Sequence, residues 1–242
     1  MEKCYNIYEG LDLLAKTKNN DYKAYAKFDE GITLMINSIC ENKRNFSFYY
    51  ENYSDALKES RKGNILAAEA LISRAKKYID KSLLNEEENK LYDLICTPVD
   101  AYLFYKKQDY TEAKLRTKET MILDSYFEER FPIVFYHKIQ QMQNLARIAL
   151  RENKINEALD VLKLTFALLI NKTQISYYDI YFKPAFLKLE TEEFRKSMIY
   201  DILKELISTG ESKEESEKSY IMDFCTQIIN NPSLKLNDFH IS

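Results

Sequence analysis

The side chains best suited to acid–base or metal chemistry in this chain are its two histidines and its clustered carboxylates. His137 and His240 lie far apart, and neither has a Cys or a carboxylate at a spacing typical of metal sites. Acidic residues gather at 86–88 and between 211 and 217, and paired carboxylates can act as acid and base. Lys213 lies within the second run, which is typical of a solvated helix start. We therefore expect no catalytic residue and no metal ligand among them.

Sequence motifs that hold phosphates, cofactors or nucleophiles are also missing. The chain contains no HExxH, GxSxG, Walker-type or GxGxxG sequence, and its 4 glycines cannot supply a glycine-rich phosphate loop. This argues against the common NTPases, hydrolases and dinucleotide enzymes. We expect a protein without a cofactor that is not an enzyme. A helical enzyme that uses scattered carboxylates, Tyr and His remains the alternative of a different class.

The cysteines and the apolar runs predict the compartment. Cys4, Cys40, Cys96 and Cys225 are widely spaced and form no CxxC pair, so free thiols in a reducing cytoplasm are expected. Residues 1–16 carry charges within their apolar stretch and lack a small-residue cleavage site, and the sequence has no uncharged run of about 18 apolar residues. The prediction is a cytoplasmic protein that is neither exported nor membrane-spanning.

Charge gives no general attraction to polyanions. The chain has 35 Lys and Arg against 38 Asp and Glu, so binding to nucleic acid or to an anionic membrane is not predicted, although a local basic face would allow a nucleic-acid contact. With 4 Gly and 4 Pro and no Gly/Ser/Pro-rich stretch, the sequence lacks the turns of an all-β protein. Long helices are favoured.

A repeat of 45 residues organises the middle of the chain. Alanines twelve residues apart recur at this period, as the pairs Ala56/Ala68, Ala101/Ala113 and Ala146/Ala158. Each second alanine follows a polar turn and an apolar residue. Small side chains at such positions allow two antiparallel helices to approach closely where they cross. The pattern predicts three helical hairpins.

The turns of these hairpins resemble a known family. The stretches 105–113 (YKKQDYTEA) and 151–158 (RENKINEA) are similar to the turn and second-helix start of a tetratricopeptide repeat, and 63–75 is a third, weaker match. The resemblance covers roughly residues 50–170 and concerns packing, not chemistry. The sequence departs from the family in its 45-residue period, against about 34, and in having Asn52, Thr97 and Met142 where a large aromatic is usual.

The resemblance implies an all-α, right-handed α-solenoid of antiparallel hairpins in one domain over 1–230. Residues 1–45 would form a degenerate first hairpin, in which Tyr25 replaces the alanine, residues 46–172 three hairpins, 173–230 C-terminal capping helices and 231–242 an irregular tail. Helices are expected near 2–17, 21–41, 47–61, 64–81, 86–107, 110–124, 132–151, 154–171, 175–188, 191–208 and 212–230. Pro98 should kink the fifth helix, Thr191 should cap the tenth, and Gly210 should separate the last two.

In such a solenoid the first helix of each hairpin lines a concave groove. Counting from the alanine pairs predicts a peptide- or protein-binding groove formed by Tyr50, Tyr53, Arg61, Tyr102, Tyr105, Lys106, Gln140, Gln143, Asn144, Arg147 and Arg151. Tyrosine supplies apolar area with a polar tip, amides can bond a peptide backbone, and arginine can hold a carboxylate. The alternative is that the four tyrosines fill gaps between hairpins and the arginines form a solvated stripe.

The sequence therefore favours a non-catalytic interaction module, an adaptor or chaperone-like scaffold. A peptide-sensing regulator that acts through another protein is the alternative, because bacterial regulators with tetratricopeptide-like domains bind short signalling peptides in a similar groove. A homodimer is compatible with either hypothesis, since an uncapped solenoid end exposes apolar surface.

Overall fold

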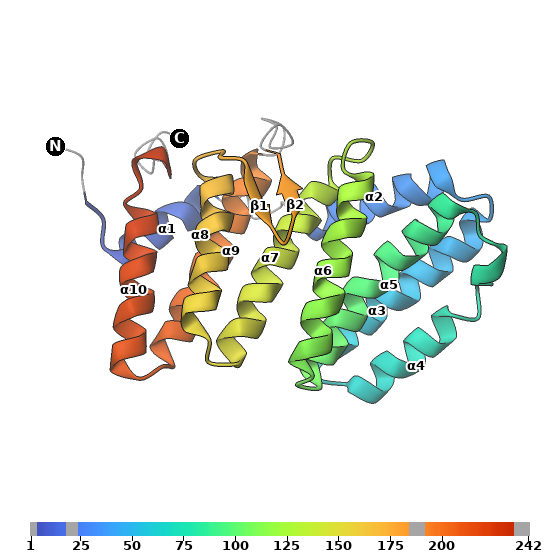
Figure 1. The fold of residues 1–242 in the computed structure, drawn as a ribbon, viewed down its shortest axis with the longest axis horizontal. Helices are drawn as coiled ribbons and strands as arrows, with labels where there is room; N and C mark the ends of the chain where they lie inside the picture. The colour runs from blue at the N-terminus through green and yellow to red at the C-terminus, as the bar shows by residue number, and fades with distance from the viewer. Residues whose placement is uncertain (1–3, 18–23, 184–191, 235–242) are drawn as a thin grey trace. The chain divides into compact units, whose positions relative to one another are not determined.

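The computed structural model describes residues 4–17, 24–183 and 192–234 (Figure 1). Within these ranges the chain forms ten α-helices and one two-stranded sheet, which confirms the all-α prediction. The chain divides into two compact units. One is continuous and spans 25–152, and the other combines 1–24 with 153–242. The boundary at 152/153 falls inside the third predicted hairpin, and the prediction of a single domain stays a prediction.

The continuous unit, 25–152, consists of helices joined by short turns. Its helices are α2 (Ala24–Ile39), α3 (Lys43–Lys62), α4 (Ile65–Ala75), α5 (Glu86–Lys106), α6 (Tyr110–Phe127) and α7 (Val134–Arg151), with a 3₁₀ turn at Lys81–Leu83. Helix α3 packs against α4 and α5, α5 packs against α6, and α6 packs against α7. Two successive helical pairs, α3/α4 and α5/α6, are therefore packed together by contact between their first helices, α3 and α5.

The turns between paired helices repeat in backbone conformation at the sequence period. Gly63, Gln108 and Asn153, spaced 45 residues apart, have φ of 88°, 65° and 59°. The residues that follow them have nearly equal angles, with φ/ψ of −82°/67° at Asn64, −83°/77° at Asp109 and −94°/65° at Lys154. At the first two turns the amide of the left-handed residue and the next amide bond back to the preceding helix, closing a Schellman motif.

Side-chain caps define where several of these helices begin. Asn85 accepts from the Glu88 amide at 2.9 Å, and the Glu88 carboxylate accepts from the Asn85 amide at 3.1 Å, which completes a capping box at the start of α5. Asp109 caps α6 in the same way, through the Glu112 amide at 3.1 Å. The cap of α3 at Asn42 places its start four residues before the predicted 47.

The core of this unit is aromatic at the α3/α5 contact. Tyr49 and Tyr53 are fully buried, and the Tyr49 ring stacks on Tyr92 with centroids 4.4 Å apart. The five period-marking alanines of this unit, from Ala56 to Ala146, are all buried, as close helix crossings require. Gly31 of α2 meets Ile133 so closely that an added Cβ would lie 2.4 Å from the Ile133 Cγ2, so this position requires glycine.

The second unit contains α1 (Ile7–Thr17), α8 (Ile155–Leu169), β1 (Ile175–Tyr177), β2 (Ile180–Phe182), α9 (Glu192–Glu211) and α10 (Glu215–Ile229), followed by a 3₁₀ turn at Pro232–Leu234. Helix α1 packs against α9 and α10. Asn230 joins both ends of the chain, because its side chain accepts from the Tyr5 amide at 2.8 Å and donates to the Tyr5 carbonyl at 3.0 Å.

One helix prediction for this unit is wrong. The segment 175–188 was expected to be helical, but Ile175–Tyr177 and Ile180–Phe182 pair as an antiparallel hairpin, with Tyr178 and Asp179 in the left-handed region at its turn. Gly210 lies in the last turn of α9, one residue before the helix ends at Glu211, so it falls at the break between the last two helices as predicted. An added Cβ there would be 2.9 Å from Ile221 Cγ2.

Some predictions are not decided by the described residues. The degenerate turn at 20–25 falls mainly outside them, as does Thr191, the predicted cap of α9. Helix α5 runs through Pro98 without interruption from Glu86 to Lys106. The predicted tail contains the short 3₁₀ turn at Pro232–Leu234, and the rest of it, 235–242, also lies outside the described ranges.

Candidate functional site

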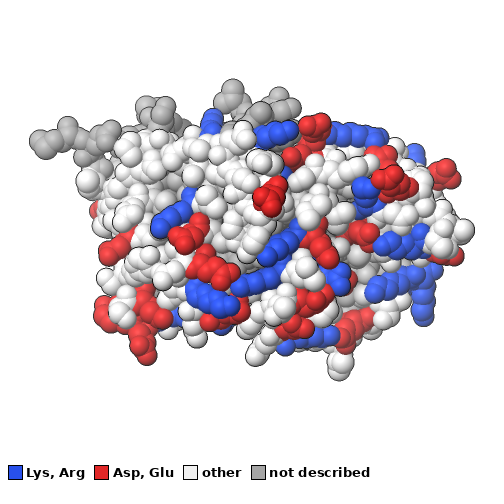
Figure 2. All heavy atoms as spheres, in the orientation of Figure 1, with Lys and Arg blue, Asp and Glu red and all other residues white. Residues whose placement is uncertain are grey.

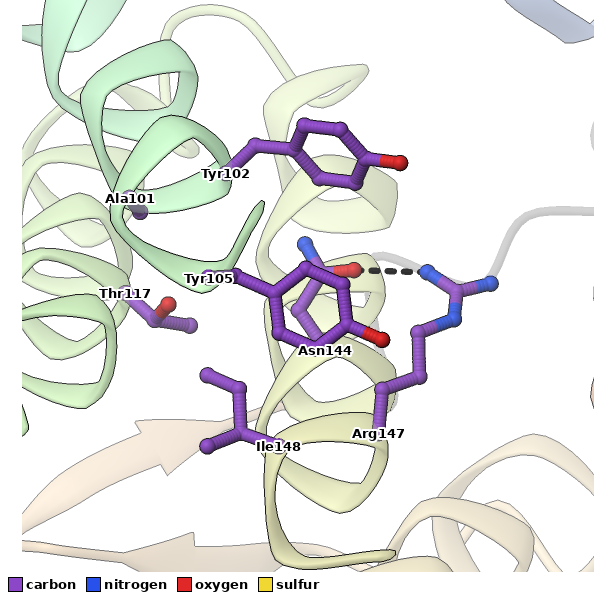
Figure 3. Close-up of a pocket in the computed structure, with 7 residues that line it drawn as sticks. All are labelled: Ala101, Tyr102, Tyr105, Thr117, Asn144, Arg147 and Ile148. Carbon is purple, nitrogen blue, oxygen red and sulfur yellow. Dashed lines mark hydrogen bonds between the residues drawn. The ribbon is translucent and has the colours of Figure 1, made fainter. Parts of the chain in front are cut away.

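A pocket in the 25–152 unit gathers several of the predicted groove residues. It encloses about 280 Å³ of empty space and opens to the surface among α5, α6 and α7. Its lining, drawn in Figure 3, consists of Ala101, Tyr102, Tyr105, Thr117, Asn144, Arg147 and Ile148. This space includes open solvent at the mouth, so the pocket is small and suits at most a single anchoring side chain.

Helical spacing brings these residues together. On α5, Tyr102 and Tyr105 are three residues apart and so share a face; on α7, Asn144 is followed at the same interval by Arg147. In Figure 3 the two tyrosine rings lie on the α5 side, opposite Asn144 and Arg147. Buried side chains of Ala101, Thr117 and Ile148 form an apolar floor. The Thr117 hydroxyl donates to its own helix, at 2.7 Å from the Ala113 carbonyl, so the floor offers mainly methyl groups.

Aromatic rings and cations form the rim. The rings of Tyr102 and Tyr105 have centroids 5.8 Å apart, and the Lys106 ammonium lies 5.9 Å from the Tyr102 ring centre. The Arg151 Nε donates to the Tyr105 hydroxyl at 3.1 Å, which ties the C-terminal end of α7 to α5. The rim therefore combines apolar ring surface with positive charge.

Below the rim, side chains of α7 form a hydrogen-bond chain that leads to a buried acid on α6. Arg147 Nη1 donates to Asn144 Oδ1 at 2.6 Å, and Asn144 Nδ2 donates to Gln141 Oε1 at 3.0 Å. The Gln141 Nε2 lies 3.0 Å from His137 Nε2, and His137 Nδ1 lies 2.9 Å from Asp124 Oδ1. We call these five residues the α7 chain. It connects the pocket with the interior of the unit.

The inner end of the α7 chain is deeply buried. Asp124 is 0% exposed and His137 7%, and the His137 ring stacks on Phe28 of α2 with centroids 4.7 Å apart. Burial raises the pKa of Asp124 above its ordinary value, while the electrostatic interaction and hydrogen bond with His137, followed by the positive charge of Lys138, act in the opposite direction. Lys138 itself is paired in the interior with Glu128, at 3.0 Å.

An Asp–His pair can orient a catalytic base, but this one faces the wrong way for that role. His137 does not line the pocket, and its Nε2 is engaged with the Gln141 amide. Across the described ranges, no group of three or more His, Cys, Asp or Glu side chains is arranged to hold a metal ion. The arrangement is suited to holding side chains in place.

The other predicted groove residues do not line this pocket. Tyr53 is fully buried in the core, which corrects its assignment to the groove, and Gln143 is 7% exposed. Tyr50 is half-buried, and its hydroxyl donates to the Asp29 carboxylate. Arg61 is exposed in the last turn of α3, and Gln140 is half-buried on α7.

Sequence reasoning missed the inner half of the α7 chain. His137 was set aside because no partner stands near it in sequence, and Asp124 is thirteen residues away on another helix. A signal was present, since His137, Gln141 and Asn144 follow each other at four- and three-residue spacing in a helix whose other buried positions are mostly apolar. That spacing places three hydrogen-bonding side chains on one stripe.

The thiols are placed for packing. Cys40 and Cys225 are buried, and burial raises the pKa of each to about 12; the half-buried Cys96 has its pKa raised to about 11, also chiefly by burial. Cys4 is exposed. All four are free cysteines in the structure.

A second, wider hollow in the other unit lies between the starts of α8 and α10. It is lined by Asn153, Lys154, Ile155, Asn156, Glu157, Ser216, Glu217 and Tyr220, and it is open to the surface. The Lys213 ammonium donates to the Asn153 side chain at 2.7 Å beside it. With charges of both signs and a shallow form, it defines no ligand chemistry.

The comparisons with known proteins assign no family. The chain matches no protein-family model, no curated protein and no solved structure. Among the described helices, none has the length and apolar character needed to cross a membrane. On the face shown in Figure 2, Lys and Arg side chains are intermixed with Asp and Glu.

Proposed function

We propose that this protein is a non-catalytic peptide- or protein-binding module, an adaptor or scaffold, and that a side chain of its partner enters the pocket among α5, α6 and α7. The observation that carries the proposal is the convergence of Tyr102, Tyr105, Asn144 and Arg147 on an apolar floor. Four of the eleven residues predicted from sequence as a binding groove line this one pocket.

The chemistry of the pocket suits a short anchor. Its floor of methyl groups favours an apolar side chain, whose full burial contributes roughly 1.5–3 kcal/mol. The Tyr102 and Tyr105 rings add contact area at a low cost in conformational entropy. The arginines at the rim favour a carbonyl or carboxylate of the partner, and a hydrogen bond to a charged group contributes about 1.5–3 kcal/mol. Together these terms are typical of an interaction hot spot.

The wider binding surface that we propose is the concave side of a right-handed solenoid. Repeated left-handed turns at Gly63, Gln108 and Asn153, and the packing of α3 against α5, support a stack of hairpins. In this proposal α9 and α10 are the capping helices. The protein would act in the cytoplasm, without a cofactor. The intermixed charges in Figure 2 favour a protein partner over nucleic acid.

The proposal is tested by selecting displayed random peptides on the purified protein. The test variant reverses the two pocket-side charges, Arg147→Glu with Arg151→Glu. The matched control, Arg74→Glu with Lys77→Glu, makes the same change in net charge at exposed positions in and just after α4. Circular dichroism and thermal melting must be alike for all three proteins before selection begins.

We expect peptides enriched on the wild-type protein and on the control to lose binding to the pocket variant by at least roughly tenfold, the loss of one charge-assisted hydrogen bond. Enrichment that is equal on all three proteins would place binding elsewhere. The absence of any enriched peptide would refute the proposed function.

A further inference from the structure

The two ends of the α7 chain fix the direction of every hydrogen bond between them. The guanidinium of Arg147 can only donate, and the carboxylate of Asp124 can only accept. The side chains between the ends can each be turned around, because amides can rotate and imidazole has two tautomers. Only one arrangement satisfies all four contacts, with every donor oriented toward the buried acid.

Reversing the direction of one hydrogen bond in the α7 chain would force two N–H groups to face each other at the next contact, and so on as far as the pocket. If the His137 proton moved to Nε2, it would oppose an N–H of Gln141, whose amide would have to rotate. The rotated amide would present its N–H to the N–H of Asn144, which would have to rotate in turn. The Asn144 N–H would then face the N–H of Arg147, and the contact at the pocket would be lost.

We propose that Asp124 is a positioning residue for the binding pocket, because it fixes the tautomer of His137 and thereby holds the guanidinium of Arg147 at the pocket wall. The inference deepens the proposed function, and rests on it in that the pocket is where the partner binds. Asp124 itself touches no ligand. The effect passes through His137, which is 7% exposed, and Gln141, which is 2% exposed.

Other buried polar groups of α6 and α7 do not reach the pocket, which distinguishes them from the α7 chain. The buried pair of Lys138 and Glu128 joins the same two helices, but neither residue lines the pocket. Thr120 is 0% exposed on α6, one turn before Asp124, and its hydroxyl donates to the Arg116 carbonyl of its own helix at 2.9 Å. Thr120→Val is therefore a matched control that alters a buried polar group without touching the chain.

The test is nuclear magnetic resonance on the ligand-free full chain. Because the sequence holds 2 histidines, His240→Gln leaves the ¹⁵N signals of His137 alone, and Arg147→Lys identifies the Arg147 guanidinium by difference. In the wild-type protein we expect the His137 proton on Nδ1. We also expect hindered rotation of the Arg147 guanidinium, seen as separate Nη signals.

Three variants distinguish positioning from packing. Asp124→Leu removes the His137–Asp124 bond and leaves Arg147 alone to set the direction of the α7 chain. It should therefore weaken the Nδ1 tautomer preference and speed the Arg147 rotation measurably. Asp124→Asn keeps an acceptor for His137 and should restore both signals. Thr120→Val should change neither. If Asp124→Leu fails to fold, Gln141→Leu interrupts the hydrogen bonds of the α7 chain in the middle. It should release Arg147 while leaving the His137 tautomer in place.

A His137 proton on Nε2 in the wild-type protein, or an Arg147 rotation rate that is unchanged by breaking the chain, would overturn the inference. Because the measurement uses no ligand, its failure is distinguishable from a failure of the peptide selection. A positioned Arg147 on a protein that selects no peptide would refute the proposed function alone.

Discussion

Replacing His137 with phenylalanine tests how strongly the buried carboxylate of Asp124 depends on its partner. Phenylalanine keeps the approximate size of the ring and can keep the stack on Phe28, whose centroid is 4.7 Å away in the wild-type protein. It removes both ring nitrogens. Asp124 then loses the donor at 2.9 Å, and Gln141 loses the acceptor at 3.0 Å.

The structure sets the magnitude of this effect. Asp124 is 0% exposed, and its second oxygen, Oδ2, has no hydrogen-bond partner among the described residues, so no water-facing atom relieves the charge. Removing one partner of a buried charged pair destabilises a protein by about 3–5 kcal/mol. The Gln141 amide keeps only its longer bond to the backbone carbonyl of residue 137, at 3.4 Å, and this adds up to about 1 kcal/mol. We therefore expect His137→Phe to lower the free energy of unfolding by at least about 4 kcal/mol at neutral pH.

The double variant Asp124→Asn/His137→Phe isolates the charge. Burial raises the folded-state pKa of Asp124 above its ordinary value of 3.8, so the folded protein binds the proton more tightly than the unfolded chain. The penalty of His137→Phe relative to the double variant should be absent below about pH 3.8. It should grow as the pH rises to the folded-state pKa, and stay constant above it.

Urea unfolding followed by circular dichroism, from about pH 4 to about pH 8, measures both quantities. At neutral pH the double variant should regain at least about 2 kcal/mol over the single one. A single variant within about 1 kcal/mol of the wild-type protein, or a difference between single and double variants that is independent of pH, would refute the reasoning.

Three further perturbations test the packing. Gly63→Ala should lower the free energy of unfolding by about 1 kcal/mol, because φ is 88° at this position, although nothing lies within 4 Å of an added Cβ. Gln108→Gly should raise the free energy of unfolding by up to about 1 kcal/mol, because φ is 65° there. Urea titrations giving the opposite signs would contradict the turn assignment. Gly31→Ala should destabilise by about 1–3 kcal/mol through its contact with Ile133 and be rescued by Ile133→Ala in thermal melts, whereas no rescue would mean another cause. A thiol reagent should modify Cys4 rapidly in the native protein and the three other cysteines only on unfolding, and rapid modification of more than one thiol would be inconsistent with their burial.

Local patterns in the sequence predicted most of the helices but misjudged segments that depend on distant neighbours. The alanine pairs and polar turns are local signals, so the helix ends next to Gly63 and Gln108 were placed within one residue. The far end of α4 was not, because the helix ends at Ala75, six residues before the predicted 81. The run 175–182 is short and apolar, and periodicity cannot separate a strand from a helix at that length. Gly210 was placed correctly at the end of α9, and the structure adds that α10 approaches it closely, with Ile221 Cγ2 2.9 Å from where a Cβ would lie.

The candidate site was predictable only where one helix determines it. Counting along α5 and α7 selected Tyr102 and Arg147, which line the pocket, although their role in binding stays a prediction. The same counting put Tyr53 in the groove, because nothing in α3 alone reveals that Tyr49 and Tyr92 close over that position with centroids 4.4 Å apart. Asp124 was missed for the same reason, since its partner is on a different helix.

The polar interior of α7 is better explained by the pocket than by stability. Replacing a buried charged pair with apolar residues of similar volume is often neutral or stabilising, so packing alone does not call for Asp124 and His137 in the interior. A continuous chain of hydrogen bonds does restrict the side chain at its end, because each bond restricts the next. Arg147 is that side chain, and it lines the pocket, where holding a long side chain in one rotamer before binding lowers the entropic cost of binding. The α7 chain thus joins a fold whose helices follow from local sequence to a site that depends on contacts between helices.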